Sequence, residues 1–389
     1  MTAMADAAVA ERPAGPDGPA GAAADIPPAT GGGPTIAVLD SQESLGIGIW
    51  KVPFYRALKR AYPGCTITLI VAKRTLMAGG GLRALTAPYV DHVVEQAGIE
   101  KPLGAAARRL RALPRYDLVF DARTKVLRVI WARLFLRHGA FVSMLPGWWL
   151  STRRRARPAR SRHWVDRLMA MVELATGAPA DWRGRIALPE DVRAAAAHLL
   201  PDGPVYVGLA PGAAGAYKVW PLDRFADLAR RLTAAGRQPV FLIGPNEGEM
   251  VAPLRAAVPG ALFPEIDRDD PHPEVRGPAL ALGLGERLSA AVCNCTGIGH
   301  LLANAGTPLV SLFGPTDPRR FLPWVEPVRA LRAQDFGGGE AMEAIPVDAV
   351  AEAVEALIAQ AARTAAAAGD APDAVGTDRP RAPHPVQAR

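Results

Sequence analysis

Residues 290–318 read AAVCNCTGIGHLLANAGTPLVSLFGPTDP and contain every part of a strand–turn–helix–strand unit. AAVCN is a short apolar run typical of a buried strand, and CTGIG is a glycine turn. HLLANAG has helical spacing and ends in glycine, and PLVSLFGP is a second apolar run. Strands that alternate with helices predict a parallel sheet covered by helices on both faces.

The same alternation continues along the chain on both sides of this stretch. Further buried strands are predicted at TIAVLDS, TITLIVA, VDHVVE and YDLVFDA in the first half, and at PVYVGLAPG and PVFLIGP in the second. We therefore predict an α/β protein with two Rossmann-like domains, residues 35–188 and 189–362, facing across a cleft. Ligands of open α/β sheets bind beyond the carboxyl ends of the strands, which is where the second-half glycine turns lie.

Composition limits the remaining classes. A chain of 389 residues with 49% hydrophobic content can form two cores, and its three cysteines fit a reducing cytosol better than a disulfide framework. Residues 1–34 and 363–389 are rich in Ala, Pro and Gly and are predicted to be disordered. The N-terminus lacks the basic start and apolar core of a signal peptide. Arginine interrupts every apolar run before it reaches the length of a membrane span.

One segment of the chain, whose formal net charge is +7, is strongly basic. Residues 151–167, STRRRARPARSRHWVDR, hold seven arginines against one aspartate. This segment is either a solvated loop or an electrostatic landing site for an acidic substrate or an anionic lipid surface. Nucleic acid is a weaker candidate, because the segment has one aromatic residue and no recognisable nucleic-acid module around it.

The apolar stretch 126–150, VLRVIWARLFLRHGAFVSMLPGWWL, leads into the arginine-rich segment and is predicted to be helical. Its apolar face either packs against the N-terminal sheet or forms a surface element. In the second case Trp148 and Trp149 would lie at a lipid interface. Anionic headgroups would then meet the arginines that follow, Arg153, Arg154, Arg155 and Arg157.

The turn after AAVCN has the features of a phosphate site. Thr296 is a candidate N-cap, and the first N–H groups of the next helix would be free to bind an anion, assisted by the helix dipole. Gly297 and Gly299 would let a ligand approach the backbone closely. A metal site is disfavoured because Cys293, Cys295 and His300 lack further ligands nearby in the sequence.

Two other chemistries are less consistent with these residues. A cysteine nucleophile would need a base and an oxyanion site, and Cys293 fits a core position better. A nicotinamide-dependent dehydrogenase is disfavoured because the first strand turn, DSQESLGIGIW, has no G-x-G-x-x-G. A nucleotide pocket remains.

Three C-terminal blocks resemble the ADP-heptose:lipopolysaccharide heptosyltransferase family, family 9 of the glycosyltransferases. They are PGAAGAYKVWPLDRFADLARRL, LIGPNEGE and CNCTGIGHLLANAGTPLVSLFGPTDP. The N-terminal blocks SLGIGIWKVPFYRALKRAYPG, YDLVFDA and RHWVDRLMAMVELATG match more loosely. The resemblance implies the GT-B fold, with an N-terminal acceptor domain and a C-terminal donor domain. It also implies inverting transfer from a nucleotide-diphospho-sugar, ADP-linked donors favoured, to an acidic lipid-linked acceptor, without a metal or other cofactor.

The resemblance assigns roles to several positions. Lys218 matches the family lysine beside the donor phosphates, and a cation there can neutralise a departing diphosphate. Glu247 lies in the loop that meets the ribose. The other matching positions form the two phosphate-side turns: Pro211, Gly212 and Ala213 in the first, and Thr296, Gly297, Ile298, Gly299 and His300 in the second.

The chain departs from the family at two positions. Ile47 occupies the place of the catalytic aspartate in the first N-terminal turn, and Cys295 occupies the place of the donor-site aspartate. The substitute base is expected to be Glu43, in the same loop as Ile47. The other candidates are Asp40, Glu95 and Asp121.

Two functional classes therefore stay open. The first is an active glycosyltransferase of the cell envelope, cytoplasmic or peripheral at the inner membrane. The second is a catalytically weak or inactive relative that binds a nucleotide sugar or glycan.

Overall fold

The computed structural model describes residues 32–41, 45–79, 82–156, 158 and 161–369. The chain divides into two compact units, Met1–Gly184 and Arg185–Arg389, where the sequence indicated a boundary near residue 188. Each unit is built on a five-stranded sheet in which all pairings are parallel. The prediction of an α/β protein with two Rossmann-like domains is therefore confirmed.

The first sheet has the strand order β3-β2-β1-β4-β5. Its strands form from the apolar runs because parallel strands covered on both faces bury nearly every side chain. The strand order reverses at β1 and β4, and Leu39 is paired with Asp121 there. The strands are β1 (Thr35–Asp40), β2 (Thr66–Val71), β3 (His92–Val94), β4 (Tyr116–Asp121) and β5 (His138–Ser143).

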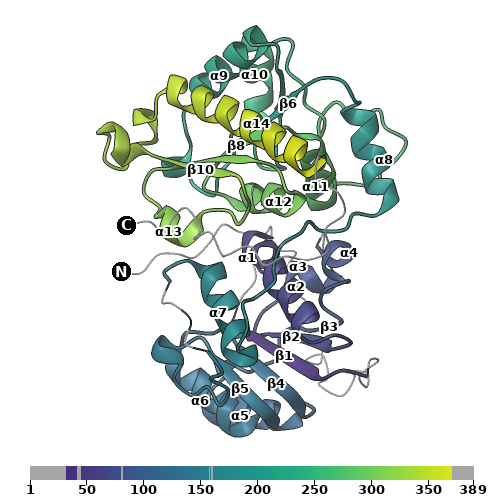
Figure 1. The fold of residues 1–389 in the computed structure, drawn as a ribbon, viewed down its shortest axis with the longest axis vertical. Helices are drawn as coiled ribbons and strands as arrows, with labels where there is room; N and C mark the ends of the chain where they lie inside the picture. The colour runs from purple at the N-terminus through teal and green to yellow at the C-terminus, as the bar shows by residue number, and fades with distance from the viewer. Residues whose placement is uncertain (1–31, 42–44, 80–81, 157, 159–160, 370–389) are drawn as a thin grey trace. The chain divides into compact units, whose positions relative to one another are not determined.

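Two helical layers cover this sheet (Figure 1). On one face, Leu110 of α5 and Val129 of α6 share a buried core with Leu39 and Val119 of the sheet. On the other face, Phe54 of α2 packs edge-on against Phe120, with ring centroids 5.8 Å apart, and α7 packs beside α2. The helices of this unit are α1 (Leu45–Trp50), α2 (Val52–Ala61), α3 (Leu76–Gly79), α4 (Arg83–Thr86), α5 (Leu103–Ala112), α6 (Val126–Phe135), α7 (Trp164–Thr176) and the 3-10 turn η2 (Pro146–Trp148).

The prediction of one helix over residues 126–150 is wrong in its second half. The helix α6 ends at Phe135, and the chain continues as strand β5 and the turn η2. Pairing with β4 satisfies the backbone of β5 and buries Phe141 and Val142. Gly139 permits this approach, because a Cβ there would lie 2.8 Å from the backbone oxygen of Asp117.

The arginine-rich segment is not simply a solvated loop. The backbone N–H of Arg155 donates to the oxygen of Leu174 in α7 at 2.8 Å. Burial raises the pKa of the Tyr62 hydroxyl, and the positive charge of the nearby Arg153 opposes that rise. Both arginines therefore lie beside the α2–α7 layer, on the opposite face of the sheet from α6. Arg157 is outside the described residues.

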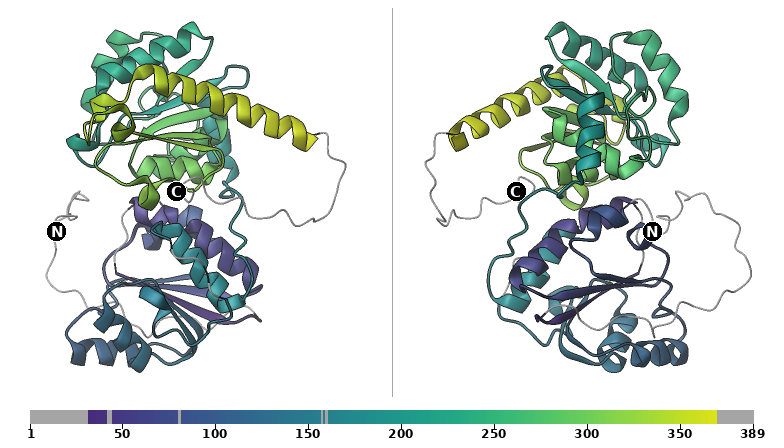
Figure 2. Two further views of the ribbon diagram at one scale, coloured as in Figure 1. Left: turned by 60° about the vertical axis from the view of Figure 1, so that its left-hand side comes forward. Right: turned by 90° about the vertical axis from the view of Figure 1, so that its right-hand side faces the viewer.

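The second sheet has the strand order β10-β9-β8-β6-β7, and the C-terminal helix Val347–Gly369, yellow in Figure 2, packs against its strands. The sheet includes β10, which the sequence patterns did not indicate. Its order reverses between β6 and β8, so the turns after these two strands lie at the switch point. The strands are β6 (Tyr206–Ala210), β7 (Gln238–Phe241), β8 (Ala290–Asn294), β9 (Leu309–Phe313) and β10 (Val328–Arg332).

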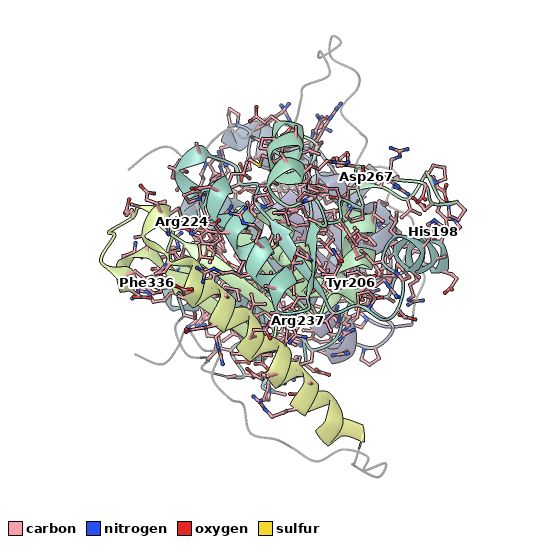
Figure 3. The ribbon with its side chains drawn as sticks, turned by 90° about the horizontal axis from the view of Figure 1, so that it is seen from above. His198, Tyr206, Arg224, Arg237, Asp267 and Phe336 are labelled. Carbon is pink, nitrogen blue, oxygen red and sulfur yellow. The ribbon has the colours of Figure 1, made fainter. Side chains whose placement is uncertain are left out.

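The long helix α14 lies beside α9 in the second unit (Figure 3). Arg237 and Glu355 form an ion pair at 2.8 Å, and Arg224 of α9 donates to the backbone oxygen of Ile345 at 2.8 Å. The helices are α8 (Glu190–Leu199), α9 (Leu222–Ala234), α10 (Val251–Ala257), α11 (Gly277–Arg287), α12 (Gly297–Ala305), α13 (Pro318–Phe321) and α14 (Val347–Gly369), with 3-10 turns η3 (Ala216–Lys218), η4 (Gly248–Met250), η5 (Ala333–Phe336) and η6 (Met342–Ala344).

The chain ends were predicted to be disordered over residues 1–34 and 363–389. Residues 363–369 are instead helical, because α14 continues to Gly369. Thr35, the predicted first residue of the N-terminal domain, is the first residue of β1. Residues 1–31 and 370–389 lie outside the described part. No helix within the described ranges is both long and apolar enough to cross a bilayer.

Candidate functional site

Three segments of the second unit meet at the carboxyl ends of β6 and β8. They are the turn Pro211–Gly212–Ala213 after β6, the turn Cys295–Thr296 after β8, and the segment that carries Lys218. This is the switch point of the sheet, where doubly wound folds bind ligands. The sequence predicted all three segments as parts of one site.

One buried side chain joins these segments. Asn294, the last residue of β8, is fully buried. Its Oδ1 accepts a hydrogen bond from the backbone N–H of Trp220 at 3.1 Å, and its Nδ2 donates to the backbone oxygen of Pro211 at 2.8 Å. Asn294 therefore fixes the first turn and the lysine segment to the strand that leads into α12.

Lys218 is positioned by an anchored tryptophan two residues further on. Trp220 is fully buried, and its indole N–H donates to the backbone oxygen of Ile345 at 3.0 Å. Pro221 then starts α9. The Lys218 ammonium lies 5.4 Å from the centroid of the Tyr217 ring, a favourable cation–π distance. The Lys-x-Trp-Pro block thus holds a partly exposed cation on a rigid support.

The helix α12 begins directly after the second turn. Thr296 occupies the N-cap position with an extended backbone, as predicted, but its side chain makes no capping hydrogen bond. The N–H groups of the first turn are therefore not used by this side chain, and the helix dipole favours an anion at this end. Gly306 closes the helix in the left-handed region with φ of 82°.

Gly299 has a packing role that the sequence did not indicate. A Cβ at this position would lie 2.8 Å from Sγ of Cys293 and 3.3 Å from Cγ of Pro323. The glycine therefore lets α12 pack closely on β8. Ile298 is partly buried and His300 is buried on the same helix.

Both cysteines of the Cys-x-Cys pair are poor nucleophiles. Cys293 is fully buried in the core, as predicted, and burial raises the pKa of its thiol to about 12. Burial also raises the pKa of Cys295, although the nearby Thr316 hydroxyl and the Lys218 ammonium oppose the shift. Both thiols are therefore neutral at pH 7.

Glu247 lies against the first turn. A Cβ at Gly212 would lie 2.6 Å from its Oε1, and a Cβ at Gly244, just after β7, would lie 2.3 Å from its Oε2. Glycine at these two positions makes room for the carboxylate. Burial raises the pKa of Glu247, and the Gly244 N–H opposes that rise by a hydrogen bond.

A second acidic residue accompanies Glu247. Burial, with the negative charge of Glu247, raises the pKa of Glu265 to about 7, although the backbone N–H of Ile243 and the charge of Arg268 oppose the rise. Ile243 and Gly244 are consecutive residues after β7, so the two carboxyl groups share one strand end. Sequence reasoning missed Glu265, since a single Glu in a loop carries no distinguishing pattern.

The proposed base, Glu43, lies outside the described residues, and the Ile47 side chain is not described either. The alternatives are engaged in the first unit. Lys51 forms a buried ion pair with Asp40 at the end of β1.

The two remaining carboxylates are also bound by neighbours. Arg123 binds the fully buried Asp121 through two bonds, Nε to Oδ1 at 2.8 Å and Nη2 to Oδ2 at 2.7 Å. Glu95 accepts a hydrogen bond from the backbone N–H of Thr75. Among the residues that the structure describes, no group of three or more His, Cys, Asp or Glu side chains is arranged to hold a metal ion.

Comparison with known proteins places this geometry in context. The family described as glycosyltransferase family 9 (heptosyltransferase) matches residues 104–340, which include the switch-point turns of the second unit. No curated protein matches the chain in sequence.

Several solved structures share the fold. The glycosyl transferase family 9 protein from Veillonella parvula DSM 2008 is 21% identical with a TM-score of 0.63, covering 84% of this chain and 97% of that one. E. coli ADP-heptose lps heptosyltransferase II is 21% identical with a TM-score of 0.59, covering 84% and 99%. E. coli heptosyltransferase WaaC with ADP is 18% identical with a TM-score of 0.58, covering 83% and 99%. These similarities confirm the predicted GT-B fold.

Proposed function

Because this chain belongs to glycosyltransferase family 9, we propose that it transfers a heptose or related sugar from a nucleotide-diphospho-sugar to a cell-envelope lipid or polysaccharide. We propose an ADP-linked donor, inverting transfer without a metal, and an acidic lipid-linked acceptor. A structure with a similar fold is named as a heptosyltransferase with ADP, which supports the choice of nucleotide. The enzyme would work in the cytoplasm, at the inner face of the membrane.

The observation that carries this proposal is the convergence of three segments on Asn294. The start of α12 can bind a pyrophosphate through backbone N–H groups and the helix dipole. Lys218, fixed by Trp220, supplies a positive charge for the diphosphate that leaves the sugar. Pro211, Gly212 and Ala213 line the first turn, and Glu247 beside Gly212 can accept hydrogen bonds from ribose hydroxyl groups.

We propose that Glu43 is the general base that deprotonates the acceptor hydroxyl. Asp40, Asp121 and Glu95 are already engaged by Lys51, Arg123 and a backbone N–H, which leaves the loop carboxylate as the best candidate. A general base contributes about 10²–10⁴-fold to turnover.

One observation favours a second function, a nucleotide-sugar-binding relative with little or no activity. The Cys295 thiol is neutral, and the sequence resemblance places an aspartate at this position and the catalytic aspartate at Ile47. Such a protein would keep the phosphate site and lose the transfer.

Calorimetric titration with ADP and UDP tests the proposed donor site. Lys218→Ala should weaken nucleotide binding by about 1.5–3 kcal/mol, the range for a hydrogen bond to a charged group. Lys101→Ala, which removes an exposed lysine of the first unit, is the matched control and should bind as wild type does. Equal binding by wild type and Lys218→Ala would refute the placement of the phosphates. Tight binding without transfer from any nucleotide sugar would establish the inactive relative instead.

A further inference from the structure

The helix α6 is apolar on two opposite faces. Its inner face packs Val129 and Ala132 into the core of the first unit. On its outer side, Leu127 and Leu134 are 65% and 68% exposed. Arg128 and Arg133 lie between these two faces, so the outer face is a separate apolar stripe that is exposed at Leu127 and Leu134.

The outer residues form a continuous stripe. Leu127, Ile130, Trp131 and Leu134 follow the spacing i, i+3, i+4, i+7, which places them on one face of the helix. Ile130 and Trp131 are partly exposed, and Trp131 also packs against the core of the first unit. Eight large apolar side chains are exposed in the described part of the chain, and α5 and α6 supply half of them: Leu103, Val126, Leu127 and Leu134. A concentration of this kind marks an interaction surface.

The surroundings of the stripe are strongly basic. Residues 101–137 contain ten lysines and arginines against two aspartates, a net charge of +8 in a chain whose formal total is +7. The helices α5 and α6 hold five arginines and no acidic residue. Arg111 of α5 reaches across to α6, where its guanidinium lies 4.7 Å from the centroid of the Phe135 ring. The two helices thus present one surface, with exposed Arg108 and Arg111 beside it.

We propose that the outer face of α6, together with the exposed edge of α5, binds the surface of an anionic lipid bilayer. The leucines would enter the boundary between headgroups and acyl chains, and the flanking arginines would contact lipid phosphates, as in amphipathic helices that lie in the membrane interface. The inference deepens the proposed function, because it rests on an acceptor that is anchored in a membrane and names the surface that reaches it.

A second copy of this chain is a poorer occupant. A symmetric dimer through this surface would place the same patch on both partners, so the exposed Arg108 and Arg111 of each copy would face like charges, and Glu100 is already paired with Arg128. Like charges at close range oppose such an interface. An anionic membrane instead supplies opposite charge and an apolar layer together.

The proposed surface is distinct from the arginine-rich segment. Arg153 and Arg155 lie beside α2 and α7, on the other face of the sheet from α6. Membrane binding through α6 and binding through the arginine-rich segment can therefore be separated by mutation.

Vesicle co-sedimentation of the full chain tests the proposal. The probes are vesicles of phosphatidylcholine alone and of phosphatidylcholine mixed with phosphatidylglycerol, at low and high salt. Wild type should bind the anionic vesicles, and high salt should weaken the binding because it shortens the Debye length. The double substitution Leu127→Ser/Leu134→Ser should reduce binding at least tenfold. The matched control Ile266→Ser/Phe336→Ser removes exposed apolar side chains from the second unit and should bind as wild type does.

Four results would overturn the proposal. They are no binding by wild type at low salt, an equal loss in both double variants, a loss seen only in Arg153→Ser/Arg154→Ser/Arg155→Ser, and a lipid-free dimer that the leucine substitutions dissociate. Lys218→Ala should bind vesicles normally, and the leucine variant should keep wild-type ADP affinity. Failure of the membrane surface is therefore distinguishable from failure of the donor site.

Discussion

Replacing Asn294 by alanine should loosen the proposed donor site and destabilise the second unit. The substitution removes the acceptor for the Trp220 N–H and the donor to the Pro211 oxygen, at 3.1 and 2.8 Å. Both partner residues are buried, so each group would be left without its hydrogen bond in a region of low dielectric.

The size of the effect follows from these two bonds. Each buried polar group left unsatisfied costs about 1–3 kcal/mol, and a water molecule entering the vacated space would recover part of it. We therefore expect a loss of about 2–3 kcal/mol, which lowers the Tm of a unit of this size by roughly 5–10 °C. Because the first turn and Lys218 would lose their common support, ADP affinity should also fall by about tenfold or more.

Differential scanning calorimetry and isothermal titration with ADP measure both quantities. Asn304→Ala is the control, since Asn304 is a buried asparagine of α12 whose amide donates within its own helix, to the backbone oxygen of His300 at 3.0 Å. The control should lose stability and keep most of its ADP affinity. If Asn294→Ala binds ADP as tightly as the control does, Asn294 does not organise the site and the reasoning fails.

Three further predictions concern the base, a carboxyl pair and a packing contact. Glu43→Gln should lower turnover by about 10²-fold or more with nearly unchanged nucleotide affinity, and unaltered turnover in steady-state kinetics would exclude Glu43. Burial and the charge of Glu247 raise the pKa of Glu265 from 4.5 to about 7, so the folded chain binds more protons than the unfolded chain in that range and stability falls as pH rises through it. Glu265→Gln should flatten this fall in urea titrations at several pH values; an unchanged slope would contradict the assignment. Gly299→Ala should cost about 1–3 kcal/mol of unfolding free energy, because its Cβ would lie 2.8 Å from Sγ of Cys293; Cys293→Ala should recover most of the loss, and additive losses in the double-mutant cycle would refute the contact.

The strands that sequence patterns predicted share one property, a short apolar run bounded by turn residues. β2 and β6 are buried at every position, which is why the run alone reveals them. β5 was hidden because HGAFVS follows the apolar helix α6 without a turn signal, and periodicity cannot separate adjacent apolar segments. β10, VRALR, pairs with β9 only and buries just one of its five residues, Val328, so its composition resembles a polar loop.

The candidate site was predictable in its backbone and less so in its side chains. Glycine turns and the Lys-x-Trp-Pro block are local patterns, and they located Gly212, Lys218 and Thr296 at one switch point. The role of Asn294 depends on hydrogen bonds to residues 74 and 83 positions away in the chain. No local pattern encodes such contacts. The packing role of Gly299 was hidden as well, because a glycine that permits helix–strand packing has the same sequence signature as one that admits a ligand.

The position of the arginines relative to the apolar face of α6 could not be predicted from the sequence either. In the sequence, the apolar stretch 126–150 and the arginines after it are continuous, and their continuity left one joint surface open as an alternative to packing against the sheet. In the structure, the strand β5 separates the apolar helix α6 from these arginines. After β5 and the turn η2, the chain can continue on either face of the sheet. It continues along α7, where Arg155 is tied to Leu174. The exposed arginines beside the leucines of α6 come instead from α5. This helix precedes α6 in the chain and is separated from it by the strand β4. Sheet topology, rather than sequence order, thus decides which charges surround an apolar surface, and it explains why the vesicle experiment must test the two groups of arginines separately.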